Sequence, residues 1–483
     1  MKAPEYLPKA AKARKPSAKA KAKSPAKELD HLFDPRSIVL VGASHSGLKL
    51  GGVVLKNILR LRPRVRIFPV NPKFNRLMGA RAYSTAGDIW NRRGRGGLKG
   101  KADLAIIIRP AREVPDILRE LKGRVHCTIV VSAGFAESGK TELQNEVRRI
   151  AREGGIRLAG PNCMGVSNSS NGLDTFILPE ERFRRPRPGS VAIVTQSGAV
   201  LSLLCEAFSL SGPEMGSSIT AHYGNAADID ESDIFEYLET HEKTKAVICY
   251  IESVRDGRRF IRRTRRLARK KPLLVLKAGK GTAGQAAAFS HTGRLAGSYE
   301  VFKSVLAQFS LPEAADFEDL VDGAKALALQ RPVKGNRVLI LTNGGGAGVL
   351  ASDECSRQGF SEAQIRPRKL ARLKKIFPSF YMSGNPFDLT AQVTDGDYRS
   401  VLEELKDDYD GFIVIALSAV KGITEGLGRI LADFRRRSGK PMVFHTGRDA
   451  VGKKLALMAG QAGIPAFDSP ERAVRALRKL LIK

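Results

Sequence analysis

Short apolar runs alternate along this chain with amphipathic stretches of helical length. Runs such as SIVLV from Ser37 and ADLAIII from Ala102 are apolar almost throughout, which is typical of strands buried on both faces of a sheet. The stretches between them repeat apolar positions at helical spacing, as in a helix that covers a sheet. Strand and helix in this alternation predict doubly wound parallel sheets with helices on both faces.

Two proline-containing, basic segments interrupt the alternation, so we expect three α/β domains in tandem. The predicted divisions are 31–178, a linker at 179–188, 189–331 and 332–483. Residues 1–30, rich in Lys, Ala and Pro, are expected to form a disordered basic tail. A chain of 483 residues is also too long for a single core.

The formal net charge is +32, and basic runs occur in the body of the chain as well as in the tail. RRTRRLARKK, from Arg262 to Lys271, is expected to be a solvated face, and nucleic-acid binding is the alternative. The chain lacks the aromatic interleaving or zinc pattern of a nucleic-acid module, so we expect no such partner for the body. The tail is left open.

The cysteines are scattered and form no CxxC pair, which predicts reduced thiols and no metal site. No apolar run approaches the ~18 residues that cross a bilayer, and no secretion signal is visible. These features predict a cytoplasmic protein. The cysteines are Cys127, Cys163, Cys205, Cys249 and Cys355.

Three strand-to-helix turns are rich in small residues: Val41 to Gly52, Thr195 to Ala199 and Thr342 to Gly348. Small residues let backbone N–H groups approach an anion at a helix N-terminus. Close packing of helix on strand is the alternative explanation for each turn. The first of these turns lacks the strict GxGxxG spacing of dinucleotide sites, and none of the three has a GxxxxGK[ST] pattern, so these turns do not favour a nicotinamide dehydrogenase or a P-loop kinase.

His291 lies in the stretch AAAFSHTGRLAG, between an apolar strand and a helical pattern that begins at Ser298. A neutral imidazole on such a loop can act as a nucleophile toward phosphorus. Glu252 ends the strand AVICYIE and could accept the proton of one ring nitrogen, leaving the other free to react. An inert loop histidine and a surface carboxylate are the plainer interpretations of these two residues.

Several motifs, in order, resemble those of the NDP-forming acyl-CoA synthetases, the superfamily that includes succinyl-CoA synthetase. SHTGRLAG resembles its phosphohistidine loop. FDPRSIVLVGAS, FPVNPK, VSAGFAESG and GPNCMGVSN resemble its CoA-binding domain, and GSVAIVTQSGAV, GNAADIDESDIFEYL and YIE its ligase domain. VLILTNGGGAGVLASDE, NPFDLT and IPAFDSPERAVRAL resemble the domain that follows in ADP-forming acetate–CoA ligases. The resemblance implies a Rossmann-like CoA-binding domain followed by two flavodoxin-like domains.

The resemblance also implies roles for individual residues. His291 would be transiently phosphorylated and Glu252 would orient it. The residues implied to hold phosphate are Gln196, Ser197, Gly198 and Gly293, and those implied to contact CoA are Gly42, Ala43, Ser44, Lys49, Lys73, Arg109 and Asn162. Arg109–Pro110 replaces a Val-Pro-like pair of the family, and His222 and Tyr223 stand where smaller residues are expected.

No ATP-grasp unit is recognisable, so the chain resembles an α-type subunit. The resemblance then implies a separate ATP-grasp β subunit that supplies the ATP/ADP and Mg²⁺ site, in a hetero-oligomer. The implied reaction converts acyl-CoA, ADP and phosphate into carboxylic acid, ATP and CoA through acyl phosphate and phosphohistidine. A CoA- or acyl-CoA-binding regulatory protein with an inactive ligase core is the alternative.

Overall fold

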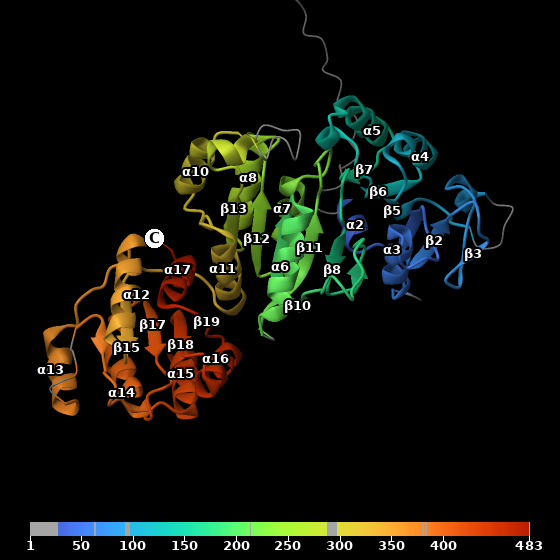
Figure 1. Ribbon diagram of the computed structural model, residues 1–483. Coiled ribbons are helices and arrows are strands. Elements are labelled where there is room, and N and C mark those ends of the chain that lie inside the picture. Colours follow the sequence, from blue (N-terminus) through green and yellow to red (C-terminus); the bar gives the residue numbers. More distant parts are fainter. Residues whose placement is uncertain are drawn as a thin grey trace, which may run out of the picture.

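The computed structural model describes residues 28–61, 64–91, 97–212, 214–286, 297–378, 381 and 384–482. Three α/β units follow one another along an elongated molecule, in the order of the sequence (Figure 1). Most of the tail predicted at 1–30, and the stretch 287–296 with His291 and Gly293, lie outside the described residues. The predicted α/β architecture of tandem parallel sheets is confirmed.

The first sheet has five parallel strands in the order β2-β1-β5-β6-β7. Its strands are β1 (Ser37–Val41), β2 (Arg66–Val70), β5 (Ala102–Ile107), β6 (Val125–Val130) and β7 (Arg157–Ala159). Its helices are α2 (Asp30–Phe33), α3 (Leu50–Leu59), α4 (Val114–Leu121) and α5 (Thr141–Glu153), and β3 (Arg76–Leu77) and β4 (Ala80–Arg81) form a small separate hairpin. The chain reverses direction across the sheet between β1 and β5, and ligands of such sheets bind at this switch point.

The second sheet has six strands in the order β13-β12-β10-β11-β8-β9. Its parallel strands are β10 (Arg187–Thr195), β11 (Gly216–His222), β12 (Ala246–Ile251) and β13 (Leu273–Lys277), and its antiparallel edge strands are β8 (Val166–Asn168) and β9 (Leu173–Asp174). Its helices are α6 (Gly198–Leu210), α7 (Glu231–Thr240), α8 (Gly257–Ala268), α10 (Tyr299–Gln308) and α11 (Phe317–Leu329). The switch point of this sheet lies between β10 and β12.

The third sheet has five parallel strands in the order β16-β15-β17-β18-β19. They are β15 (Val338–Thr342), β16 (Phe387–Asp388), β17 (Gly411–Ala416), β18 (Met442–Thr446) and β19 (Ala466–Phe467). Its helices are α12 (Gly345–Arg357), α13 (Pro367–Ile376), α14 (Asp395–Leu405), α15 (Glu425–Ser438), α16 (Ala450–Gln461) and α17 (Pro470–Leu480). Ser469 caps α17 through a hydrogen bond from the Arg472 N–H, at the start predicted for the terminal helix.

The strands β8 and β9 join the first two units more closely than the sequence suggested. They come from residues 166–174, inside the predicted first domain, yet β8 pairs with β11 of the second sheet and β9 pairs with β8. The predicted linker at 179–188 is also packed, because Phe183 is buried against Phe176 with ring centroids 5.3 Å apart. The strand pairing of β8 and the packing of Phe183 therefore hold the first two units together along residues 166–188.

The second and third units meet through α11 and α17. Gly323 of α11 allows this contact, since a Cβ there would lie 2.3 Å from a methyl of Leu274 and 3.3 Å from Lys479. The buried Lys479 ammonium pairs with Asp319 at 3.0 Å. The segment at the predicted boundary between residues 331 and 332 leads into β14 (Val333–Lys334), which pairs with β20 (Leu481–Ile482). In the part of the chain that the structure describes, no helix is long and apolar enough to cross a membrane.

Candidate functional site: two crevices at the carboxyl ends of the strands

We use the term first crevice for the edge of the first sheet where β1 and β5 end side by side, and second crevice for the edge where β10 and β12 end, because ligands of such sheets bind at these positions. Gly42 follows β1 with φ +89°, and a Cβ there would lie 2.2 Å from the carbonyl oxygen of Ile108. Gly51 of α3 packs equally closely, with its Cβ position 2.0 Å from the Gly42 carbonyl oxygen. These glycines therefore serve the close packing of helix and strands, which was the alternative to anion binding. The same packing brings the start of α3 to the switch point.

Polar groups from β1 and β2 meet over this crevice. The Asn71 amide donates a hydrogen bond to the carbonyl of Ala43 at 2.8 Å and accepts one from the Lys73 N–H at 2.9 Å. Ser44 is buried and its hydroxyl accepts from the Ser46 N–H at 3.1 Å. Asn71 thus fixes the turn that carries Lys73, a role that the sequence analysis missed although Asn71 lies within the quoted FPVNPK.

The rim of the first crevice combines cations with exposed apolar side chains. Lys49 and Lys73 are exposed at its edge. Leu48 is 97% exposed and Phe74 is 37% exposed. Apolar surface beside exposed cations suits a ligand with both phosphates and an organic body.

The structure gives Arg109 and Asn162 defined contacts near the same edge. Arg109 follows β5 and pairs with Glu113 at 2.6 Å, so its charge is partly compensated. Asn162 follows β7 in a left-handed conformation, and its N–H donates to the Ser132 carbonyl at 2.9 Å. Their proposed contacts with CoA remain predictions.

The second crevice is organised by the side chain of Gln196 at the end of β10. Its Oε1 accepts hydrogen bonds from the N–H groups of Glu252 at 2.8 Å and Ser253 at 3.0 Å, and its Nε2 donates to the Ser253 hydroxyl at 3.1 Å. The amide therefore ties β10 to the end of β12 at the switch point. The resemblance implied that Gln196 binds phosphate. In the structure its side chain instead holds the segment that carries Glu252.

A buried lysine lies beside Glu252. Lys277, the last residue of β13, donates from its ammonium to the Glu252 carbonyl at 2.7 Å and also to the Ala278 carbonyl. It is 2% exposed. Burial lowers the pKa of Lys277, and the nearby carboxylates of Glu252 and Glu313 oppose that shift. The sequence analysis did not single out Lys277, because a lysine that ends an apolar strand usually reaches solvent.

His222 closes the other side of the second crevice with a fixed tautomer. Its Nδ1 accepts a hydrogen bond from the Met164 N–H at 2.8 Å, so that nitrogen carries no proton. Its Nε2 lies 3.0 Å from the Gln196 carbonyl oxygen and therefore donates to it. His222, which stands where the resemblance implies a smaller residue, is thus held by backbone groups of Met164 and Gln196.

The start of α6 faces the same crevice. Ser197 caps the helix, since its hydroxyl accepts from the Val200 N–H at 3.4 Å. Gly198 leaves room for the Met164 side chain, whose sulfur would lie 2.4 Å from a Cβ at this position. The N-terminus of α6 thus approaches the second crevice closely enough for its N–H groups to face an anion.

The segments that flank residues 287–296 are joined to each other. Lys280, before them, pairs with Glu313 at 3.0 Å, and the Tyr299 hydroxyl, after them, donates to Glu313 at 3.0 Å. Burial and the Glu313 carboxylate raise the pKa of Tyr299 to about 12, so the hydroxyl remains a donor. β13 and the Ser298 cap of α10 lie where the sequence predicted the strand and helix on either side of His291.

The third unit repeats the turn of the second. Thr342 exchanges hydrogen bonds with Gly344 at 3.0 and 3.1 Å, as Thr195 does with Ser197 at 3.1 and 3.0 Å. Asn343 takes the place of Gln196, because its amide accepts from the Leu417 N–H at 2.7 Å and donates to the Leu417 carbonyl at 3.2 Å. Both TQSG and TNGG therefore lock a switch point in the same way.

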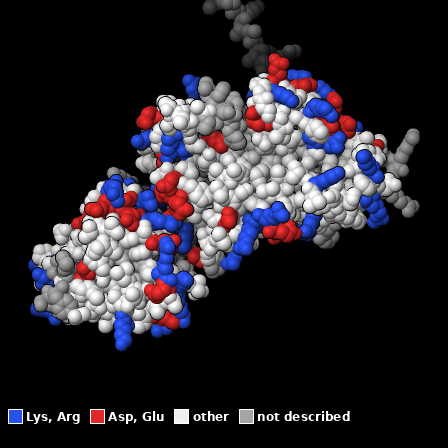
Figure 2. All heavy atoms as spheres, viewed as in Figure 1, with Lys and Arg blue, Asp and Glu red and all other residues white. Residues whose placement is uncertain are grey.

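The basic run from Arg262 to Lys271 forms an ion-pair ladder with α7. Its pairs are Arg263–Glu236, Arg266–Glu239 and Lys270–Glu239, and Arg259, which precedes the run on the same helix, pairs with Asp233. Basic and acidic side chains are interspersed over the face seen in Figure 2, without one unbroken basic surface. Arg262, Arg265, Arg266, Arg269 and Lys270 are exposed, so the run is a solvated face, as expected, and part of it pairs with acidic side chains of α7. All cysteines are buried and free, and no cluster of His, Cys, Asp or Glu suited to a metal occurs among the described residues.

Family profiles match three consecutive parts of the chain. They are the CoA binding domain over residues 36–169, the succinyl-CoA ligase like flavodoxin domain over 188–327 and the ligase-CoA domain over 338–417. The α subunit of ADP-forming acetate–CoA ligase II from Pyrococcus furiosus is 34% identical over 466 residues, which cover 94% of this chain and 97% of that subunit.

The chain belongs to the α-subunit family of ADP-forming acetate–CoA ligases.

Another member of the acetate–CoA ligase family, from Methanocaldococcus jannaschii, is 33% identical over 94% of this chain, but only 63% of that longer protein is matched. A solved structure of the dinucleotide-forming acetyl-coenzyme A synthetase 1 of Ca. Korarchaeum cryptofilum, in complex with phosphate and ADP, superposes with a TM-score of 0.83. The two are 30% identical, and the match covers 94% of this chain and 96% of that one. The resemblance found in the sequence is therefore confirmed for the family and the fold.

Proposed function

We propose that this chain is the α subunit of an ADP-forming acyl-CoA synthetase. The observation that carries the proposal is the end-to-end match to the Pyrococcus furiosus α subunit, 94% of one chain against 97% of the other. The net reaction is acyl-CoA, ADP and phosphate to carboxylic acid, ATP and CoA. The two crevices support it, since each brings charged and polar groups to the switch point of its sheet.

The first crevice is assigned to CoA. Its chemistry fits, because Lys49 and Lys73 are free to neutralise phosphates while Leu48 and Phe74 offer apolar surface. Gly42, Ala43 and Ser44 would contact the diphosphate through the turn after β1. Arg109 and Asn162 would extend the contact along the ends of β5 and β7.

The second crevice is assigned to the phosphoryl chemistry. Inorganic phosphate attacks the thioester carbonyl, giving acyl phosphate and CoA. His291 then attacks the phosphorus of the acyl phosphate. The O–P bond breaks, and the carboxylic acid leaves with that oxygen. Glu252 would hold the proton of the other ring nitrogen, while Ser197, Gly198, Gln196 and Gly293 would surround the phosphoryl group.

The phosphohistidine would then pass its phosphoryl group to ADP on a partner subunit. We assign the nucleotide and Mg²⁺ to an ATP-grasp β subunit, because the longer Methanocaldococcus jannaschii relative carries further chain beyond the matched 63%. A covalent phosphohistidine allows the phosphoryl group to move between the acyl phosphate site of this chain and the nucleotide site of the partner, which one bound geometry could not bring together. We also place the enzyme in the cytoplasm.

The test is co-purification with a candidate β chain, followed by thioester cleavage that depends on ADP and phosphate over a panel of acyl-CoAs. Labelled ATP and Mg²⁺ should give an acid-labile, base-stable phosphate on the α chain. His291→Asn should abolish both label and turnover, while His445→Asn, a matched histidine in the third unit, keeps both. Turnover by His291→Asn at the wild-type rate would refute the assignment.

A further inference from the structure

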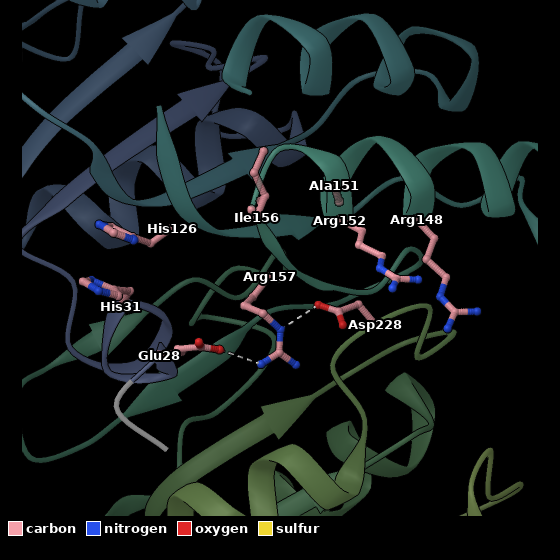
Figure 3. A pocket seen from close by; sticks show the side chains of 10 residues that line it. Glu28, His31, His126, Arg148, Ala151, Arg152, Ile156, Arg157 and Asp228 are labelled. Carbon is pink, nitrogen blue, oxygen red and sulfur yellow. Dashed lines mark hydrogen bonds and ion pairs between the residues drawn. The ribbon is translucent and has the colours of Figure 1, made fainter. Parts of the chain in front are cut away.

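A second cavity lies at the opposite ends of the strands from the CoA crevice. It has a volume of about 490 Å³ and opens between the first and second units, beside the starts of β6 and β7 (Figure 3). The residues that line it are Glu28, His31, His126, Arg148, Ala151, Arg152, Gly155, Ile156, Arg157 and Asp228. This volume lies within the usual range for small-molecule sites, ~300–1,000 Å³.

Two arginines in this cavity lack a counter-charge. Arg148 and Arg152 extend from α5 toward the same side (Figure 3), and among the described residues neither has an ion-pair or hydrogen-bond partner. Residues spaced in this way are neighbours on one helix face, and like charges there repel each other. A divalent anion between the two guanidiniums would remove that repulsion and accept several hydrogen bonds.

The acidic residues of the cavity do not neutralise these arginines, because a third arginine uses them. Arg157 pairs with Glu28 at 3.2 Å and Asp228 at 2.9 Å, and also with Asp233 at 2.9 Å outside the cavity. The carboxylates of Glu28 and Asp228 are thus paired with Arg157, and the positive charges of Arg148 and Arg152 remain uncompensated among the described residues. The cavity therefore carries uncompensated positive charge, which favours an anion.

Aromatic surface bounds the other end of the cavity. The rings of His31 and His126 are stacked with centroids 3.9 Å apart and an interplanar angle of 5°. Asp103 holds the stack in place through a 2.6 Å contact with His31 Nδ1. Flat rings at one end and guanidiniums at the other suit a ligand with a phosphate and a planar base.

We propose that this cavity is a second anion site, which binds a phosphate ester of mononucleotide size through Arg148 and Arg152. The site is separate from the proposed CoA crevice and does not depend on the proposed reaction. The cavity can be coupled to the second crevice through one segment of chain. This segment begins at Tyr223, directly after His222 of the second crevice, and includes Asp228 of the cavity. That segment is hydrogen-bonded to the first unit from Asn225 N to Pro161 O and from Ile229 N to Leu158 O, both at 2.9 Å.

The test measures binding to the purified full chain by calorimetry, with saturating CoA present to fill the first crevice. The probes are AMP and inorganic pyrophosphate. We expect one AMP bound per wild-type chain, and at least a tenfold weaker affinity in the double variant Arg148→Ala/Arg152→Ala. Binding of pyrophosphate with similar affinity would show that the phosphate groups suffice, whereas AMP binding alone would show that the base is recognised.

The matched control is Arg149→Ala, which removes an arginine of the same helix that already pairs with Glu153 at 2.9 Å. Its AMP affinity should equal that of the wild type. AMP should also raise the melting temperature of the wild type and of Arg149→Ala, but not of the double variant. Equal affinity in the double variant and the wild type, or no binding of either probe at millimolar concentration, would overturn the proposal.

Discussion

The side chain of Gln196 holds the backbone of Glu252, since Gln196 Oε1 accepts the Glu252 N–H at 2.8 Å. The two residues are far apart in sequence and meet because β10 and β12 are neighbours in the sheet. The position of the proposed catalytic carboxylate is thus set by an amide on the adjacent strand. This relationship makes Gln196 a positioning residue in the proposed reaction.

Replacing Gln196 with Ala leaves the buried N–H groups of Glu252 and Ser253 without their acceptor. Each such group costs about 1–3 kcal/mol of stability. A displacement of the carboxylate by about 1 Å can lower the rate on the order of 10²-fold. We expect a lower melting temperature and a kcat reduced by about that factor, measured with saturating substrates and β subunit.

Gln330→Ala is the matched control for that loss. The buried Gln330 amide also bridges to a strand, donating to the Met442 carbonyl at 2.6 Å and accepting from its N–H at 3.0 Å, but far from either crevice. It should lose stability to a similar extent and keep its kcat. Equal kcat losses in the two variants would show that the effect of Gln196 is only structural.

Lys277→Met should alter the pH dependence of turnover. The buried ammonium of Lys277 and the carboxylate of Glu252 attract each other, and the substitution by Met removes this attraction to the ionised carboxylate. The acidic limb of the kcat profile should move to higher pH. Lys325→Met removes another lysine whose pKa burial lowers, in α11, and should leave the profile in place. A profile unchanged in Lys277→Met would argue against the electrostatic role.

Gly42→Ala should impair CoA binding as well as stability. Its left-handed φ alone costs an alanine about 1–2 kcal/mol, and the added Cβ would overlap the Ile108 carbonyl at 2.2 Å. Gly79 has a similar φ of +77° but open space around it, so Gly79→Ala should show the backbone cost alone. We expect Gly42→Ala to lose more stability and to raise KM for CoA. If both variants behave alike in urea unfolding and KM, the close approach at Gly42 is unimportant.

Glu231→Gln should make the protein more stable at neutral pH. Burial and the negative charge of Asp230 raise the pKa of Glu231 from 4.5 to about 8. Folding therefore takes up a proton, so this contribution to stability is full below pH 4.5 and is lost as pH rises toward 8. Gln mimics the protonated form at every pH. Urea unfolding between pH 5 and 8 should show a smaller decline with pH in the variant.

Asp233→Asn should change the stability of the protein in the opposite direction. The guanidiniums of Arg157 and Arg259 outweigh burial and lower the pKa of Asp233, so its ionised form stabilises the fold above the ordinary carboxyl pKa. The amide should therefore destabilise the protein across the same pH range. A stabilised Asp233→Asn, or a Glu231→Gln with the wild-type pH dependence, would contradict these assignments.

The sequence predicted the central strands well because both faces of each are buried. β1 and β12, for instance, are apolar runs that end in small or polar residues. It could not predict β8, whose three residues have no distinct pattern and form a strand only beside β11. Short edge strands of this kind depend on tertiary pairing more than on local propensity.

In the candidate site, too, some residues could be predicted from the sequence and others depend on tertiary contacts. Glu252 could be proposed from the sequence because it ends a strand, whereas a role for Ser197 was implied by the family resemblance. The roles of Lys277, Asn71 and His222 arise from hydrogen bonds between segments that only the sheet order brings together. The fixed tautomer of His222, in particular, requires the Met164 N–H from another unit, which no local pattern reveals.

The β8–β9 hairpin has a mechanical consequence. Since the chain of the first unit completes the sheet of the second, these two units cannot part without breaking backbone ladders. They should therefore move as one rigid block during turnover. Any large rotation within the polypeptide is then left to the α11–α17 junction, where packing and ion pairs, together with the short β14–β20 pairing, would have to yield.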